Sequence, residues 1–281
     1  MEWLTVKMVE GLHEAIRLGV PVSGHVANLR HATIAGLLEY GCLRHSLTDA
    51  SLPSLPHAIL SSRLGQALNE IRSPLGLRSN GSQKPHVKSV EIRDVEFHAL
   101  EGSAPTLDPA WEDFANRFFR SAVDAGFQKV VADGIGATMH ELAENVFLHA
   151  ESPVGAVVGF HVKPGVACFT IADVGVGVLA SLQTCSDYAQ LKYHGEALTA
   201  VLRNHASKFG SGKGGNGFRQ LFKSLVDQRG ELRFRTGEAR ITMSGELSSA
   251  LGVESFGESL PGFQITVVCR TANAITDHPL L

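Results

Sequence analysis

Two polar side chains, Glu141 and Asn145, lie four residues apart in a segment with the spacing of an amphipathic helix. Residues i and i+4 sit one turn apart on a helix, so a carboxylate and an amide oxygen would come together there. Such oxygen ligands suit a hydrated Mg²⁺ and a bound water. The opposite, apolar stripe is expected to pack on a sheet and consists of Met139, Leu142, Ala143, Val146 and Phe147. An ordinary solvated helix face has the same spacing, so that alternative stays open.

A second candidate is Asp173, which ends an apolar run typical of a β-strand and is followed by Gly175 and Gly177. A carboxylate at a strand end can accept a hydrogen bond from the exocyclic amine of a ligand. Glycines next to it would let the backbone approach a ring closely. A simple Asp-x-Gly turn would explain the same residues, and the motif alone does not decide between the two.

A third candidate is the glycine-rich string 210–217, which directly precedes a predicted helix at 218–228. Backbone N–H groups at such a helix start form an anion site, so the string predicts a phosphate chain as the ligand. A P-loop does not fit, because Ser207 and Gly214 stand where its first glycine and its Ser or Thr after Lys213 belong. A dinucleotide fingerprint does not fit either, because no strand precedes the glycines. A flexible surface loop remains the alternative.

The elements around these candidates predict an α+β fold. Helices are expected at 111–125 and 133–150, and strands at 89–98, 155–162, 166–172, 231–235, 240–244 and 262–270. Helices followed by mostly antiparallel strands favour a two-layer α/β sandwich, with a mixed, mostly antiparallel sheet and helices on one face. The pair Asp108-Pro109 is a typical N-cap and first-turn proline for the first of these helices.

The chain is expected to divide into two domains. Residues 1–80 read as a smaller, mainly helical and regulatory N-terminal domain. A linker is placed at 81–88, within a stretch rich in Ser, Gly, Asn and Pro that begins at Ser73. The α/β domain then covers 89–272, and 273–281 form a tail.

The composition narrows the class of protein. With 281 residues, of which 44% are hydrophobic and 19% charged, the chain is typical of a globular protein. A formal net charge of -3 gives no indication of a nucleic-acid or membrane-surface partner. No apolar run approaches the length of a spanning helix and no signal peptide is recognisable, so a cytoplasmic protein is expected. The cysteines are far apart and are expected to be buried thiols: Cys42, Cys168, Cys185 and Cys269.

In their order along the chain, the three candidate elements resemble the GHKL ATPase family. That family includes DNA gyrase B, heat-shock-90-type chaperones, histidine kinases, MutL-type proteins and anti-sigma serine kinases. The resemblance covers roughly residues 88–271 and is closest to stand-alone histidine-kinase-like or anti-sigma serine-kinase-like ATPases. It implies a Bergerat-type sandwich that binds ATP and Mg²⁺.

The resemblance implies a role for each matching residue. Asn145 would coordinate the Mg²⁺ that bridges the phosphates, and Glu141 would orient or deprotonate the attacking nucleophile. Asp173 would bind the amino group of adenine. Gly175 and Gly177 would open the ATP lid.

The remaining roles fall on the lid itself, which would span 178–214, and on the second glycine box that follows. Gly215 and Gly217 match the final glycines of that box, and Lys213 would touch a phosphate.

These roles lead us to expect a soluble ATPase or a serine-kinase-like signalling protein, because Glu141 is present. The alternative is a nucleotide-gated module without turnover that grips a protein partner through the lid or the N-terminal domain; a homodimer is also compatible. The string 68–75 looks like the phosphoacceptor box of histidine kinases, but Asn69 occupies the place of the histidine. The chain is therefore not expected to be a complete histidine kinase.

Overall fold

The structure is a computed structural model that describes residues 3–47, 52–70, 88–92, 95–100, 104–152, 155–204, 230–244 and 252–274. The strands are β1 (Trp3–Leu4), β2 (His31–Ala32), β3 (Ser89–Ile92), β4 (Val95–Leu100), β5 (Ala156–Lys163), β6 (Val166–Asp173), β7 (Glu231–Ser244) and β8 (Val253–Arg270). The helices are α1 (Val6–Arg17), α2 (Ser23–Ala27), α3 (Ile34–Ser46), α4 (His57–Leu60), α5 (Arg63–Glu70), α6 (Pro109–Asp124), α7 (Lys129–His149), α8 (Gly177–Gln183) and α9 (His194–Asn204).

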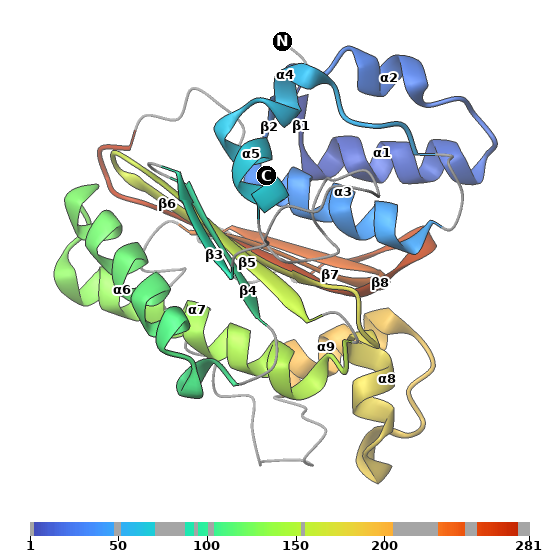
Figure 1. Cartoon of the computed structure of the whole chain (residues 1–281). Coiled ribbons are helices and arrows are strands. Elements are labelled where there is room, and N and C mark those ends of the chain that lie inside the picture. Colours follow the sequence, from blue (N-terminus) through green and yellow to red (C-terminus); the bar gives the residue numbers. More distant parts are fainter. Residues whose placement is uncertain are drawn as a thin grey trace.

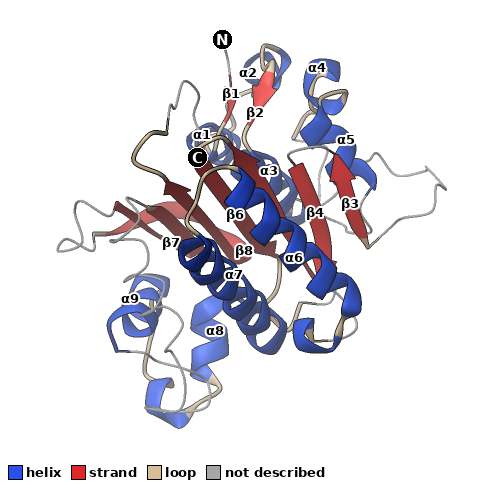
Figure 2. Ribbon diagram, turned by 90° about the vertical axis from the view of Figure 1, so that its left-hand side faces the viewer, coloured by secondary structure: helices blue, strands red, loops and turns tan. Residues whose placement is uncertain are grey.

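A six-stranded antiparallel sheet forms the centre of the described structure, with the strand order β3-β4-β5-β6-β8-β7. The short strands β1 and β2 form a separate parallel pair. Helices cover both faces of the large sheet, with α6 and α7 on one face and α1 and α3 on the other (Figures 1 and 2). The α+β class predicted from the sequence is confirmed, and the N-terminal helices form a third layer in addition to the two predicted for residues 89–272.

Side-chain caps fix the beginnings of several helices. Thr5 and Thr33 accept hydrogen bonds from the backbone N–H groups of Met8 and Gly36 at 3.3 and 3.0 Å, and so start α1 and α3. Asp108 accepts from Ala110 N at 3.1 Å and starts α6, as its pairing with a first-turn proline predicted.

Helix α7 carries two of the candidate residues and begins at Lys129, four residues before the predicted start. Four members of the predicted apolar stripe are buried, as expected: Met139, Leu142, Ala143 and Val146. Phe147 was also assigned to that stripe, but its side chain is 39% exposed. It lies at the edge of the stripe, whereas Val146 and Ala150 on either side of it in the chain stay buried.

Both faces of the central strands are buried. Residues of β6 alternate between a hydrophobic cluster with α6–α9, to which Phe169 and Ile171 belong, and a second cluster with α1–α5, to which Cys168 and Ala172 belong. An antiparallel sheet with one wet face would show polar residues at every second position, which β6 does not. Helices α6–α9 pack on one face only, as predicted for the part of the chain after residue 88, and the second apolar face is covered by the N-terminal helices.

The N-terminal segment supplies that cover. Helix α3 lies against β5, β6 and β8, and Ile34 reaches the backbone of β5 where Gly159 has no side chain. The segment and the sheet thus share one hydrophobic cluster. The division into domains 1–80 and 89–272 stays a prediction, and its proposed linker 81–88 lies almost entirely outside the described residues.

The strands differ from the prediction in three places. The strand predicted at 262–270 is longer, because β8 already begins at Val253. The single predicted strand at 89–98 is the hairpin β3–β4, in which Ile92 pairs with Val95. The two predicted strands at 231–235 and 240–244 are one long strand, β7, whose register with β8 shifts around Gly237. A β-bulge accounts for the turn-like residues there, because it interrupts the pairing without ending the strand. No helix in the described part of the chain combines the length and apolar character of a membrane span.

Candidate functional site

Asp173 lies at the end of β6, in the middle of the sheet, and is 1% exposed. Side chains alternate along a strand, so Asp173 shares a face with Phe169 and Ile171. Its partner across the ladder, Ala156, belongs to the same cluster as the helices α6–α9. The carboxylate is therefore on the side of the sheet that α7 covers, which is the side carrying Glu141 and Asn145.

The two oxygens of the Asp173 carboxylate have different surroundings. Oδ1 accepts a hydrogen bond from Gly175 N at 2.7 Å, which is the Asx turn that an Asp-x-Gly sequence predicts. Oδ2 is buried and has no hydrogen-bond partner in the described structure. Burial raises the pKa of Asp173 to about 7, although the backbone N–H groups of Gly175 and Phe263 partly offset the effect. One acceptor atom is thus left over at the end of β6.

Three glycines make room for this carboxylate and its loop. A side chain at Gly175 would collide with the carbonyl oxygen of Ala150, the C-cap of α7. Gly177 and Gly262 have φ values of 72° and 74°, which favour glycine. A side chain at Gly262 would also collide with the carbonyl of Asp173. Gly262 was missed by the sequence analysis, although a Pro-Gly pair inside a strand was a signal for a close backbone approach.

Helix α7 is tied to the Asp173 loop at its C-terminal end. Val176 N donates a hydrogen bond to the carbonyl of Ala150 at 2.8 Å. Glu141 and Asn145 lie earlier on the same helix, and both are half-buried. The structure therefore brings the helix that bears these two residues and the Asp173 loop into direct contact.

Thr236 on β7 holds the next part of the loop. Its buried hydroxyl accepts a hydrogen bond from Val178 N at 3.0 Å and donates one to the carbonyl of Gly262 at 3.1 Å. The first turn of α8 is thereby fixed to both β7 and β8. No local pattern marked Thr236, because its two partners are far from it in the sequence.

The other predicted site residues are Lys213, Gly215 and Gly217, and they lie outside the described residues together with the predicted helix at 218–228. The described part of the predicted lid contains α8 and α9. Helix α9 packs on β7, and its first residue, His194, donates a backbone hydrogen bond to Glu238 at 3.3 Å.

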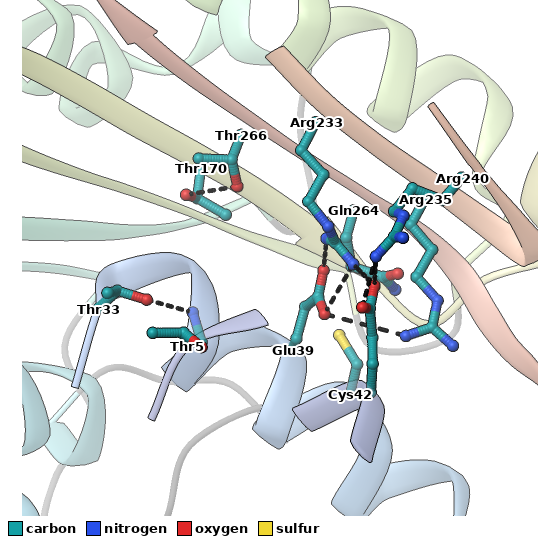
Figure 3. A network of polar contacts seen from close by, with 12 residues as sticks. Thr5, Thr33, Glu39, Cys42, Thr170, Arg233, Arg235, Arg240, Gln264 and Thr266 are labelled. Carbon is teal, nitrogen blue, oxygen red and sulfur yellow. Dashed lines mark hydrogen bonds and ion pairs between the residues drawn. The ribbon is translucent and has the colours of Figure 1, made fainter. Parts of the chain in front are cut away.

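A second group of polar residues is buried on the other face of the sheet, between β7 and the N-terminal helices. Arg233 of β7 pairs with Glu39 of α3 and, at 2.5 Å, with Glu10 of α1. Arg235 lies 3.9 Å from Glu39, and Arg240 donates to Glu10 at 2.6 Å. Figure 3 shows Arg233 and Arg235 reaching from the sheet toward Glu39.

Burial and charge act against each other in this group. Burial lowers the pKa of Arg233 to about 10 even though Glu10 opposes the effect. Burial alone would raise the pKa of Glu10, but Arg233 and Arg240 outweigh it and the pKa lies below its usual value. The sequence contained one signal for this group: Glu39 is the only charged residue in the run 34–43.

The cysteines carry free thiols, and three of them, Cys42, Cys168 and Cys269, are buried, whereas Cys185 is partly exposed. Over the residues that the structure describes, no group of three or more His, Cys, Asp or Glu is placed to hold a metal ion. In comparisons with known proteins, no family model, no curated protein and no solved structure matches the chain.

Proposed function

We propose that the chain is a Mg-dependent ATP-binding protein of the GHKL type, whose reaction is ATP hydrolysis or phosphoryl transfer to a protein serine. The observation that carries the proposal is the leftover oxygen of Asp173, which is buried at the end of β6 on the face covered by α7. A buried acceptor without a partner costs about 1–3 kcal/mol, and a ligand that donates a hydrogen bond to it would remove that cost.

The ligand that fits Oδ2 brings an N–H donor, as the exocyclic amine of adenine does. Oδ1 already accepts a hydrogen bond from Gly175 N, so one donor from the ligand would give Oδ2 its partner as well. Because Asp173 is 1% exposed, binding also requires that the groups covering it move aside. A hydrogen bond to the ionised carboxylate would lower its pKa again.

The metal and phosphate part of the site is proposed on α7. Asn145, which is half-buried, would hold Mg²⁺ through its amide oxygen. Glu141, one turn earlier, would orient a water or a hydroxyl group for attack and accept its proton. Bound Mg²⁺ would neutralise charge on the phosphates.

Calorimetry with Mg-ATP and Mg-GTP tests the proposal. The wild type should bind Mg-ATP, and Asp173→Asn should weaken it by roughly 10- to 100-fold while affecting GTP less, because the charge-assisted bond to the amine is lost. Asp113→Asn, an exposed carboxylate on α6, is the control and should bind normally. A wild type that does not bind Mg-ATP would refute the proposal.

Phosphate release then separates the reaction from the alternative. Turnover, or a labelled serine on a partner protein, supports an enzyme. Tight ATP binding with neither result would favour the nucleotide-gated module, in which ATP orders the lid and a partner protein is then gripped.

A further inference from the structure

Helix α3 contacts the backbone of Asp173 from the face of the sheet opposite to α7. The thiol of Cys42 donates to the carbonyl oxygen of Asp173 across 3.8 Å. Gln264 of β8 donates to the same carbonyl at 3.4 Å and to that of Pro261 at 3.2 Å. The backbone carbonyl of Asp173 is thus bound on the face of the sheet that the N-terminal helices cover, while its carboxylate lies on the face that α7 covers.

The same face of α3 is anchored to β7. Glu39 precedes Cys42 by three residues, so the two side chains project from one side of the helix. Glu39 accepts from both terminal nitrogens of Arg233, and the two side chains are only 2% and 3% exposed. Breaking a buried pair of this kind is costly, because removing one partner leaves an uncompensated charge.

Strand β7 continues this connection to the start of α8. Arg235 lies near Glu39, and the next residue, Thr236, binds Val178 N and the carbonyl of Gly262. Gly262 in turn lies against the carbonyl of Asp173. Helix α3 therefore reaches the segment 173–178 by two routes, directly through Cys42 and indirectly through β7.

We propose that α3 sets the position of the segment 173–178, so that Glu39 is a positioning residue for the nucleotide site. The consequence for nucleotide affinity rests on the proposed function, whereas the consequence for the segment itself does not. A substitution in the N-terminal helices would then change nucleotide affinity even though the substituted residue does not contact the nucleotide.

The test compares Glu39→Gln with Glu96→Gln. Glu96 is an equally buried carboxylate, 1% exposed, that pairs with Arg117 between β4 and α6 and has no link to β7. Both substitutions weaken the ion pair of a buried carboxylate, so any loss of binding that comes only from lower stability should appear in both variants. Affinity for Mg-ATP should fall roughly 3- to 30-fold in Glu39→Gln and by less than about twofold in Glu96→Gln.

Hydrogen exchange without nucleotide gives the second readout. The N–H groups of Gly175, Val176 and Val178 all donate hydrogen bonds, so a loosened segment would exchange faster. Exchange in 173–178 should rise in Glu39→Gln and stay unchanged in Glu96→Gln. If Glu39→Gln does not fold, Cys42→Ala takes its place, with the buried Cys168→Ala as its control.

Equal exchange and equal affinity in the variant and its control would overturn the inference. A selective rise in exchange in a protein that binds no ATP would support the positioning role of α3 and refute the proposed function. The two failures are therefore distinguishable.

Discussion

The substitution Asp173→Asn is expected to stabilise the protein while it weakens the binding of ATP. The pKa of Asp173 rises from 3.8 to about 7 because its carboxylate is buried. Between these two pH values the folded protein holds a proton that the unfolded chain has lost. The contribution of Asp173 to the stability of the wild type therefore falls as the pH rises through this window, and it stays level above it.

The size of the effect follows from the shift. One pKa unit corresponds to about 1.4 kcal/mol, so ionising Asp173 in the fold costs up to roughly 4 kcal/mol at pH 8. Asparagine resembles the protonated carboxyl in shape and can keep the bond from Gly175 N, but it has no charge. The difference in unfolding free energy between variant and wild type should be small near pH 4 and should grow by up to roughly 4 kcal/mol toward pH 8.

Urea unfolding of both proteins at several pH values measures this difference, with Asp113→Asn as the control, since its exposed side chain should give a difference nearly independent of pH. A cost of burying the unpartnered amide of Asn does not depend on pH. It therefore does not affect the change with pH in the difference of unfolding free energies. A difference that does not grow between pH 4 and pH 8 would refute the reasoning. A confirmed gain, together with weaker ATP binding, would mean that the carboxylate is kept for its ligand at the expense of stability.

Three further substitutions, and Gly134→Ala as a control for Gly262→Ala, test the site and the fold around it. Asn145→Ala should abolish Mg-dependent ATP binding, because a cation that needs near-octahedral geometry loses a ligand; unchanged affinity in calorimetry would contradict this role. Glu141→Ala should still bind ATP while phosphate release or transfer falls by about 10²–10⁴-fold, and normal turnover would leave Glu141 a residue of the helix face only. Gly262→Ala should destabilise the fold by at least roughly 1–3 kcal/mol in urea unfolding, because its φ of 74° is unfavourable for alanine and the new methyl group meets Asp173. Gly134→Ala on α7, where a side chain meets nothing within 4 Å, should be neutral or stabilising.

Local patterns were enough to predict the elements that bear the candidate residues. The start of α6 at Asp108 follows from one capping residue and one proline, which act over a single turn. The place of Asp173 at the end of β6 follows from the apolar run before it and the glycines after it. Such signals depend on neighbours in the chain, so they are visible without the fold.

The packing of the N-terminal helices on the sheet had two signals in the sequence. Strand β6 is apolar at nearly every position, which is typical of a sheet covered on both faces. The helices of the first 70 residues have apolar faces that also need a partner. Which face they cover is decided by the complete sheet, because the apolar surface of that face is assembled from β4, β5, β6 and β8.

The sequence by itself determined the class of fold, the helix with Glu141 and Asn145, and the turn at Asp173. The tertiary structure alone decided that one oxygen of Asp173 is buried without a partner, because residues that pack against Asp173, such as Gly262, come from a distant strand. It also decided that Arg233 is a buried residue, whereas an arginine in an alternating strand is ordinarily expected to face water. Its partner Glu39 lies 194 positions away, and a pairing over that separation exists only once the sheet and α3 have packed together.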